Sequence, residues 1–329
     1  MKWLVTGGAG FIGTNFIYRM LADHPDLEIV CLDALTYAGC IHNLDRARQD
    51  RRFSFVRGDI SKKEDVLPAI ERQGIDAVVN FAAESHVDKS IEDPGIFLQS
   101  NILGTQVLMD ACRRFDIERF HQISTDEVYG DLPLDRPDLL FSEETPIRPS
   151  SPYSASKASA DLLVQAYYRT YRLKATISRC SNNYGPYQHP EKLIPKTIMM
   201  ARNGQRIPIY GTGKNVRDWI YVEDHCTAID RILLAGRPGQ VYNIGGRSER
   251  SNLQVVSAIL HRLGKTDDAI QFVVDRPGHD MRYAIDSSKI ERELGWKAEH
   301  DFTRGLEQTI DWYIANHDWL IKVGSKPKP

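Results

Sequence analysis

WLVTGGAGFIG, at residues 3–13, decides the fold of this chain. A short apolar run leads directly into glycines spaced as Gly7-x-x-Gly10-x-x-Gly13, and the amphipathic stretch 12–22 follows. Glycines permit a tight strand-to-helix turn, and they let backbone amides at the helix N-terminus approach a pyrophosphate. The stretch therefore predicts a strand, a phosphate-binding turn and the first helix of a dinucleotide-binding unit.

Alternation of strands and helices continues outward from this turn. The expected strands are 3–6, 28–33, 53–57, 77–81, 120–124 and 175–179, and the expected helices include 12–22, 64–73, 96–115 and 153–172. Nearly continuous apolar strands between amphipathic helices are typical of a parallel sheet covered on both faces. We therefore predict an α/β fold, a Rossmann-type doubly wound parallel sheet with a smaller C-terminal substrate-binding domain.

Turn residues become denser after about residue 182, and this change predicts the domain organisation. We expect residues 1–181, together with about 215–245, to form the dinucleotide-binding domain. We expect 182–214 and 246–323 to form the substrate-binding domain and 324–329 to be a disordered tail.

Composition excludes several classes of function. The chain has 329 residues and a formal net charge of -2, which gives no basic surface for nucleic acid or an anionic membrane. No apolar run approaches the roughly 18 residues of a spanning helix, and the start shows no signal-peptide pattern. The five cysteines form no C-x-x-C pair, so we expect a reducing cytoplasmic location and no metal site.

Asp33 indicates which dinucleotide binds. It ends the second expected strand, about twenty residues after the last glycine, where a carboxylate can hold the adenosine ribose hydroxyls. The same charge repels a 2′-phosphate, so NAD is favoured over NADP. Asp59, before Ile60, either meets the adenine amino group or caps the next helix. Ala82 either allows close passage beneath the cofactor or serves tight helix–sheet packing.

A second motif lies at SPYSASK, residues 151–157. Pro152 suits the first helical position after a serine N-cap, and Tyr153 and Lys157 then lie at i and i+4 on one helix face. We expect the ammonium to lower the tyrosine pKa and make Tyr153 a base for a substrate hydroxyl. A Tyr–Lys pair alone is more often structural, but after a dinucleotide-binding turn it indicates catalysis. The predicted cofactor-binding residues are Gly7, Gly10, Phe11, Ile12, Gly13, Asp33, Asp59, Ile60, Ala82, Tyr153 and Lys157.

Together the two motifs resemble the extended short-chain dehydrogenase/reductase superfamily, in which a Ser or Thr completes the triad. By its place in TDEVYG, residues 125–130, Thr125 is assigned that role. Six segments are similar to the dTDP-glucose 4,6-dehydratases: TDEVYG, NFAAESHVD at 80–88, RCSNNYGPYQ at 179–188, PEKLIP at 190–195, RDW at 217–219 and DRPGHD-x-RY at 275–283. Asp126 and Glu127 add an acid and a base that a simple alcohol dehydrogenase does not need.

The resemblance implies a three-step reaction. Tyr153 deprotonates the glucose 4-hydroxyl while hydride passes to NAD. Glu127 then removes the C5 proton as Asp126 protonates the departing C6 hydroxyl, and hydride returns to C6. The implied substrate-binding residues are Ser85, His86, Asp88, Asn182, Glu191, Lys192, Leu193, Pro208, Tyr210, Arg217, Asn252, Arg276, His279 and Tyr283. Among them, Tyr210 would stack on the nucleobase and the two arginines would bind phosphate, while Tyr283 could equally be a core residue.

Alternatives remain open at this point. A dehydratase acting on a UDP-, CDP- or GDP-linked sugar, a sugar-nucleotide 4-epimerase, or a non-catalytic nucleotide-sensing protein would share much of the pattern. The family usually has Asn where this chain has Cys40. The long segment 131–150 is typical of a lid or a partner contact. Helices 96–115 and 153–172 resemble the pair through which the family forms a homodimer by a four-helix bundle.

Overall fold

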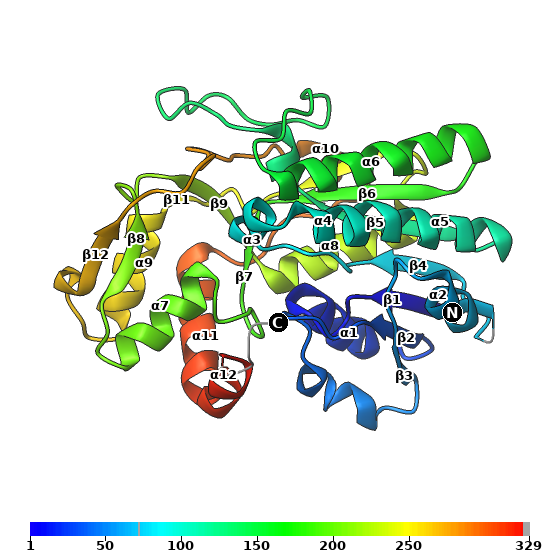
Figure 1. Ribbon diagram of the computed structural model, residues 1–329, viewed down its shortest axis with the longest axis horizontal. Coiled ribbons are helices and arrows are strands. Elements are labelled where there is room, and N and C mark those ends of the chain that lie inside the picture. The colour runs from blue at the N-terminus through cyan, green and yellow to red at the C-terminus, as the bar shows by residue number, and fades with distance from the viewer. Residues whose placement is uncertain (72, 325–329) are drawn as a thin grey trace.

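The computed structural model describes residues 1–71 and 73–324, and its centre is a parallel sheet of seven strands (Figure 1). The strands run in the order β10-β6-β5-β4-β1-β2-β3. Their bounds are β1 (Lys2–Thr6), β2 (Glu28–Asp33), β3 (Phe53–Arg57), β4 (Ala77–Asn80), β5 (Arg119–Thr125), β6 (Ala175–Cys180) and β10 (Val241–Ile244). The order reverses between β1 and β4, and such sheets bind ligands outside the strand carboxyl ends at this point. The predicted fold class is confirmed.

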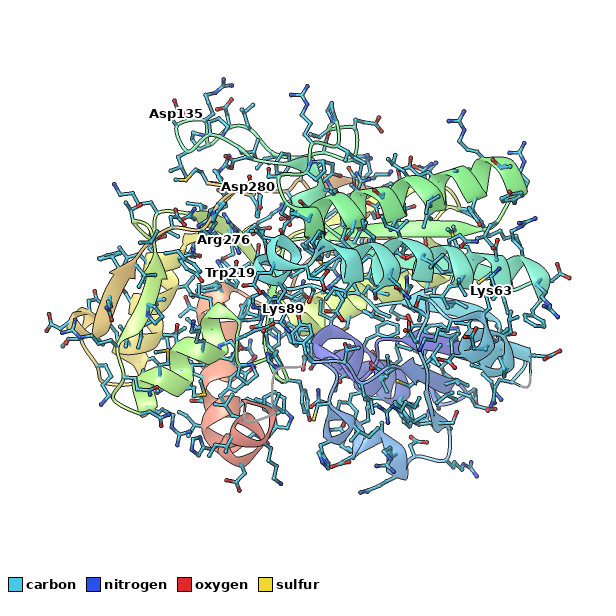
Figure 2. The ribbon with its side chains drawn as sticks, viewed as in Figure 1. Lys63, Lys89, Asp135, Trp219, Arg276 and Asp280 are labelled. Carbon is cyan, nitrogen blue, oxygen red and sulfur yellow. The ribbon has the colours of Figure 1, made fainter. Side chains whose placement is uncertain are left out.

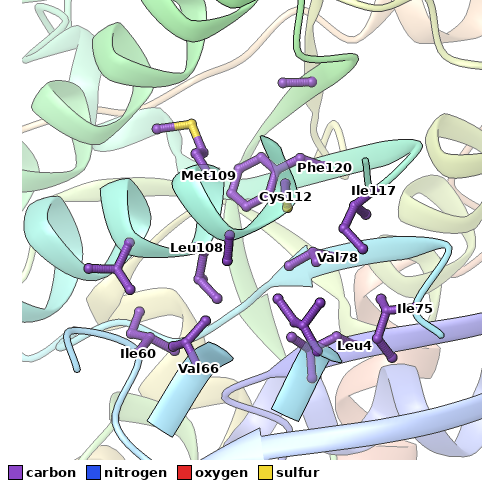
Figure 3. Close-up of a cluster of buried hydrophobic side chains, with 14 of the residues drawn as sticks. Leu4, Ile60, Val66, Ile75, Val78, Leu108, Met109, Cys112, Ile117 and Phe120 are labelled. Atoms are coloured by element: carbon purple, nitrogen blue, oxygen red, sulfur yellow. The ribbon is translucent and has the colours of Figure 1, made fainter. Parts of the chain in front are cut away.

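Helices cover both faces of the sheet. One face carries α1 (Phe11–Asp23) and α8 (Val222–Ala235), and the other carries α2 (Lys63–Glu71), α5 (Gly104–Arg114) and α6 (Pro152–Tyr171). Figure 3 shows the core beneath α2 and α5, where side chains of the strands meet those of the helices. Leu4, Val78 and Phe120 come from β1, β4 and β5, and each is fully buried. The inner strands β1, β2 and β4 place apolar residues on both faces of the sheet, which explains their nearly continuous apolar sequences.

The expected helix 96–115 is not one α-helix. It begins as α4 (Pro94–Phe97), widens into a π-helix over Leu98–Leu103 and continues as α5. Asn101 lies in the widened part and is buried; its side chain exchanges hydrogen bonds with the backbone of Glu84 and donates to Ser156 at 2.8 Å. The wider turn thus ties the end of β4 to α6, next to the sheet edge where ligands bind.

Smaller sheets and helices form the left-hand part of Figure 1. One sheet has the order β11-β9-β7 and the other pairs β12 with β8. The elements are β7 (Asn182–Tyr184), α7 (Leu193–Arg202), β8 (Ile207–Tyr210), β9 (Val216–Tyr221), β11 (Glu249–Ser251), α9 (Asn252–Arg262), β12 (Ile270–Val273), α11 (Phe302–Ala315) and α12 (His317–Gly324). The helix α10 (Ser288–Leu294) instead packs on α8 and β10 of the large sheet. Between β9 and β11 the chain returns to the large sheet through α8 and β10. How the chain divides into domains stays a prediction.

The segment 131–150 packs on residues 281–286. Asp131 Oδ1 accepts hydrogen bonds from the backbone N–H groups of Met281 and Arg282, and Phe141 exchanges backbone bonds with Ala284 and Asp286. A lid would have to break these bonds in order to move.

The expectations about membrane spans, cysteines and the C-terminal tail can also be compared with the structure. No helix among the described residues is both long and apolar enough to cross a membrane. All five cysteines are buried and none forms a disulfide with another described residue. The expected tail lies, apart from Gly324 at the end of α12, outside the described residues.

Candidate active site

The glycine turn between β1 and α1 packs against the end of β4. Gly7 has a φ of +66°, and a Cβ on it would lie 2.6 Å from the backbone nitrogen of Ala82. A Cβ on Gly13 would lie 2.5 Å from the Gly7 carbonyl oxygen. Side chains are therefore excluded here, as the phosphate-binding pattern requires. Gly10 is the N-cap of α1 and supplies no capping side chain, so the first-turn amides of Phe11 and Ile12 have neither an intrahelical partner nor a side-chain cap from Gly10.

Asp33 borders this turn at the end of β2. Its Oδ2 accepts a hydrogen bond from Ala9 N at 2.9 Å and its Oδ1 accepts one from Leu35 N at 2.7 Å. The carboxylate is 7% exposed. It lies beside the glycine turn, as an NAD ribose contact requires.

Asp59 does not cap α2 and the Ile60 side chain is buried, while the cofactor contacts expected of both residues stay predictions. Asp59 Oδ1 accepts hydrogen bonds from the backbone and hydroxyl of Ser61, both at 2.9 Å, so it closes a local turn rather than capping α2, which begins at Lys63. Ile60 is 4% exposed, and its side chain fills the space beside Gly104 of α5. The Ile60 side chain is therefore a core residue, because α5 covers it; the adenine contact of Asp59 stays a prediction.

The catalytic candidates on β5 lie at its carboxyl end. Thr125 caps a 3₁₀ turn over Asp126–Tyr129, accepting a hydrogen bond from Glu127 N at 3.3 Å. Asp126 is 1% exposed, and burial, followed by the charges of Glu127 and Asp218, raises its pKa well above the usual range. Burial also raises the pKa of Glu127, but three neighbouring cations lower that pKa and partly oppose the effect of burial.

Those cations are Arg217, Arg276 and Lys192. They lower the pKa of Glu127 and partly offset its burial. For Asp126, Arg217 and a Thr125 hydrogen bond oppose burial together with the negative charges of Glu127 and Asp218. The two adjacent carboxyl groups therefore differ, with Asp126 favouring its protonated form more strongly than Glu127.

The α6 pair was placed correctly, but the expected pKa effect was wrong. Ser151 caps α6 in a capping box, Pro152 is the first helical residue, and Tyr153 and Lys157 follow one turn apart. Lys157 Nζ donates to the Ile123 carbonyl at 2.6 Å. Burial, with the charges of Glu127 and other groups, raises the pKa of Tyr153 well above its ordinary value. Lys157 does not lower the pKa of Tyr153, because burial has the larger effect on this pKa and the Lys157 ammonium donates its hydrogen bond to the Ile123 carbonyl instead.

Arg276 links predicted substrate residues from three segments. Its Nη1 lies 3.1 Å from Asp88 Oδ1, and Asp88 Oδ2 accepts a hydrogen bond from the Tyr210 hydroxyl at 3.3 Å. His279 Nδ1 lies 2.6 Å from Asp275 Oδ1, and its ring meets that of Tyr210 edge-on at 6.3 Å. In Figure 2, Arg276 and its neighbours occupy the region between the helices of the large sheet and the smaller sheets.

Arg217 and Tyr283 form a second group near Glu127. The Arg217 guanidinium carbon lies 4.1 Å from the Tyr283 ring centre, and its Nη2 donates to the Asp280 carbonyl at 2.9 Å. Tyr283 is 3% exposed and its hydroxyl donates to the Asp280 carboxylate. Tyr283 thus belongs to the core while its ring also supports Arg217.

Glu191 joins the 80–88 and 187–192 segments. Its Oε2 lies 3.3 Å from His86 Nε2, and Lys192 Nζ donates to the Ser85 carbonyl at 3.1 Å. Burial lowers the pKa of His86, which keeps the ring neutral near pH 7. The remaining candidates are spread over the smaller sheets and their helices: Asn182 on β7, Leu193 at the start of α7, Pro208 and the 41% exposed Tyr210 on β8, and Asn252 at the start of α9.

Unpaired polar atoms indicate that this region is built for a ligand. Buried side-chain atoms without a hydrogen-bond partner among the described residues include Asp126 Oδ2, Asn182 Oδ1, Glu191 Oε1, Arg276 Nε, Glu84 Oε2 and the Tyr37 hydroxyl. Such groups are rare in folded proteins because each costs free energy when buried. The glycine turn, Asp33 and this set together fit a dinucleotide and a polar substrate.

Sequence reasoning missed three residues of this region. Tyr37 and Glu84 belong to the unpaired set; Tyr37 lies between Asp33 and Cys40, and Glu84 lies inside the segment 80–88. Asp218 accepts hydrogen bonds from Gly246 N at 3.0 Å and Ser248 N at 2.6 Å, and burial raises its pKa to about 6. Asp218 could have been identified as a candidate from the sequence, because it follows Arg217 in the family-like segment RDW.

Comparisons with known proteins agree with this geometry. Residues 4–309 match the family model described as GDP-mannose 4,6 dehydratase. The chain is 52% identical over 320 residues to a dTDP-glucose 4,6-dehydratase of Mycolicibacterium smegmatis, covering 97% of this chain and 95% of that one. It is 48% identical to an Escherichia coli protein of the same name, with 99% and 96% covered. It is also 51% identical to the low-salt glycan biosynthesis protein Agl12 of Haloferax volcanii, with 97% and 100% covered.

Solved structures extend the likeness to the fold. DesIV of Streptomyces venezuelae, a dTDP-glucose 4,6-dehydratase solved with NAD bound, superposes with a TM-score of 0.94 at 45% identity, covering 98% of this chain and all of that one. A UDP-glucose 4-epimerase of Thermus thermophilus, also in complex with NAD, reaches 0.88 at 31% identity, with 96% and 100% covered. The fold is thus shared with epimerases, and the identity is higher to the dehydratases.

Proposed function

The chain belongs to the dTDP-glucose 4,6-dehydratase family, and we propose that Thr125, Asp126, Glu127, Tyr153 and Lys157 carry out its reaction. The enzyme converts dTDP-glucose to dTDP-4-keto-6-deoxyglucose and water, with NAD regenerated in each cycle. The observation that carries the assignment is the pair of adjacent carboxyl groups at the end of β5: Asp126 is buried, and Glu127 lies among the cations Arg217, Arg276 and Lys192.

C4 oxidation falls to the residues of α6 and β5. Tyr153 accepts the proton of the 4-hydroxyl, directly or through Thr125. Since burial raises the pKa of Tyr153, the phenolate needs a nearby cation, and Lys157 has two further N–H donors beyond the one held by Ile123. The chemistry that NAD supplies when bound is the acceptance of a hydride from C4 and its later return to C6.

Elimination uses the two carboxyl groups in different protonation states. A ketone at C4 acidifies the C5 proton, so a base is needed at C5 and an acid at the C6 oxygen. Glu127 suits the base because Arg217, Arg276 and Lys192 stabilise its anion. Asp126 suits the acid because burial keeps its proton, and its Oδ2 has no partner among the described residues.

The nucleotide end is bound by the groups that surround Arg276. Arg217 and Arg276 can each hold phosphate oxygens in a bidentate manner. Asp88 now occupies Arg276 Nη1, while Arg276 Nε is buried and unpaired, so one face of this guanidinium is available to an anion. Tyr210 is exposed enough to stack on a nucleobase, and Asn182, Glu191 and Lys192 would contact the sugar and pyrophosphate. The glycine turn would hold NAD, and Asp33 would bind its adenosine ribose.

Two variants test the division of roles. Glu127→Gln should still bind NAD and oxidise C4, so absorbance at 340 nm rises on adding dTDP-glucose while no 4-keto-6-deoxy product forms. Asp126→Asn should still exchange the C5 proton with deuterated solvent but lose C6 hydroxide slowly. Glu118→Gln is the matched control, because Glu118 precedes the opposite end of β5 and is 66% exposed.

Product analysis separates this function from its competitors. Recovery of only the starting sugar and its 4-epimer would contradict the dehydratase activity, and wild-type C5 exchange by Glu127→Gln would remove Glu127 as the base. Parallel assays with UDP-, CDP- and GDP-glucose test the nucleobase preference. No turnover of any nucleotide glucose would favour a sensing protein.

We also propose that the protein is a homodimer whose α5 and α6 layers form a four-helix bundle. The support is apolar exposure: Leu98 and Leu103 precede α5 with 53% and 44% of their surface exposed, and Leu162 on α6 has 55%. Light scattering at micromolar concentration should give twice the chain mass, and Leu162→Glu should give the monomer. Leu234→Glu, on α8, is the control with similar exposure at 46%. A monomeric wild type would contradict the proposal.

A further inference from the structure

Asn43 connects the cofactor turn to the C-terminal helix. It lies in a 3₁₀ turn at Ile41–Leu44 and is 2% exposed. Its Nδ2 donates to the carbonyl of Ala9, inside the glycine turn, at 2.9 Å. Its Oδ1 accepts a hydrogen bond from the indole N–H of Trp319, on α12, at 2.7 Å. A residue 276 positions away in sequence thus contacts the side chain that holds the turn.

The indole sets the orientation of this amide. An amide side chain has one accepting oxygen and one donating nitrogen. Because Trp319 can only donate, Asn43 must turn its oxygen toward α12, and its nitrogen then faces Ala9. The Ala9 carbonyl also accepts from Cys40 N at 3.0 Å, and Ala9 N donates to Asp33. Both backbone groups of Ala9 are therefore fixed from outside the turn.

Aromatic packing holds Trp319 in place. Its ring lies 5.2 Å from Trp312 and 5.8 Å from Tyr187, measured between ring centres. Tyr187 in turn packs on Tyr18 of α1, whose hydroxyl donates to the Asn43 carbonyl. Tyr187 has a φ of +67°, an unfavourable conformation for a residue with a side chain, which this packing offsets. The helix α12 therefore reaches α1 and the glycine turn through one continuous set of contacts.

We propose that Trp319 is a positioning residue for the cofactor, acting through Asn43 and Ala9 to slow the release of NAD between turnovers. The inference rests on the proposed function, because it requires NAD to lie on the glycine turn. A dehydratase that returns the same hydride to its substrate gains nothing from exchanging NAD. A fixed turn keeps its amides aimed at the pyrophosphate, whereas a turn free to relax releases the cofactor faster.

The test compares two tryptophans of the same aromatic group. Trp319→Phe keeps a ring but removes the donor, leaving Asn43 Oδ1 buried and unpaired. Trp312→Phe removes an indole N–H that donates no hydrogen bond within residues 1–71 and 73–324. Each holoenzyme is diluted, and protein-bound NAD is measured over time after rapid gel filtration. Loss of one buried hydrogen bond predicts release about threefold to thirtyfold faster from Trp319→Phe and unchanged release from Trp312→Phe.

Thermal unfolding of both variants separates positioning from stability. Similar midpoints with different NAD release support the proposal. Equal release from Trp319→Phe and wild type overturns it, as does equal acceleration in both variants, which would indicate a general loss of packing. A wild type that binds no NAD would instead contradict the proposed function.

Hydrogen exchange on the wild type gives a second readout that needs no variant. Coupling between two binding equilibria is reciprocal, so if docking of α12 slows NAD release by tightening NAD binding, bound NAD must protect α12. We expect slower exchange of amides 317–324 in the NAD-loaded protein than in the NAD-free protein, with α9 unchanged as reference. Equal exchange of α12 in the two forms overturns the proposal even if Trp319→Phe does not fold.

Discussion

Arg282 offers a sharp test of what anchors the segment 131–150. The side chain is 2% exposed, and its guanidinium donates to both carboxylate oxygens of Glu249, at 2.6 and 2.9 Å. It also donates to the carbonyls of Arg136, Pro137 and Leu139, at 3.0 to 3.3 Å. Arg282 itself lies in the segment 275–283, which also carries Arg276 and His279 of the proposed nucleotide site, so a loosened Arg282 should also disturb substrate binding.

Lysine cannot replace this group. An ammonium has three donors on one nitrogen and cannot reach Glu249 and three carbonyls together. Arg282→Lys therefore loses two or three hydrogen bonds of about 1 kcal/mol each and leaves carbonyls unpaired. Glu249 is about one-third exposed, so the ion pair itself adds little. We expect a loss of about 2–4 kcal/mol in the free energy of unfolding.

Urea unfolding followed by circular dichroism measures the loss, and KM for dTDP-glucose reports the effect on the site. Arg237→Lys is the control, because Arg237 also pairs with a glutamate, at 2.7 Å, but is 65% exposed. It should change stability by less than about 0.5 kcal/mol. An Arg282→Lys protein as stable as wild type, with unchanged KM, would refute the view that this residue anchors the segment.

Three further outcomes are expected. Gly7→Ala should abolish NAD binding, measured by calorimetry, because the new Cβ would lie 2.6 Å from a backbone nitrogen. Gly74→Ala is the control: Gly74 has a similar φ of +62° but open space around it, so this variant should bind NAD normally. Equal NAD binding by both variants would contradict the steric reason given for Gly7. Burial lowers the pKa of His121 to about 3, so the unfolded state binds a proton first below about pH 6.5 and the histidine lowers stability as pH falls. Buried acids such as Asp218, whose pKa is raised, have the opposite effect on stability as pH falls, so wild type must be compared with His121→Gln. The free energy of unfolding lost between pH 6.5 and 4.5 should be smaller in the variant, by up to about 1.4 kcal/mol per pH unit. Parallel pH profiles of the two proteins would contradict this role of His121. Tyr210→Ala should raise KM for dTDP-glucose about threefold to tenfold through lost stacking, while Tyr210→Phe stays near wild type; identical KM values in all three would rule out stacking.

Local pattern was sufficient for most of the fold. The bounds 28–33 agree with β2 because this buried parallel strand carries an unbroken apolar run between turn residues. The bounds 53–57 agree with β3, an edge strand of the sheet whose residues Phe53, Ser54 and Phe55 alternate between apolar and polar. β10 was not predicted as a strand, since four residues are too few for a periodicity and its partner β6 lies some sixty residues earlier. The π-helix was also missed, because Asn101 adopts it to bind Glu84 and Ser156, which a helical pattern cannot reveal.

The site was predictable in position but not in its electrostatics. Parallel strands bring their carboxyl ends to one edge, so Asp33, Ala82 and Thr125 were expected near the cofactor. The pKa of Tyr153 could not be predicted, because burial outweighs Lys157 and the ammonium donates to Ile123. The contact between Asn43 and Trp319 had no signal in either segment, since it depends on how α12 docks.

The late position of β10 has a consequence for synthesis of the chain. β6 is buried along its whole length, and β10 covers the edge that β5 leaves open. A ribosome adding about 5–20 residues per second needs roughly 3–13 s to pass from residue 181 to residue 244. During that interval a nascent chain presents β6 with one edge unpaired, and this edge can pair with the same strand of a neighbouring nascent chain. Translation pauses within 181–244 would lengthen the exposure, whereas pauses after residue 244 would not.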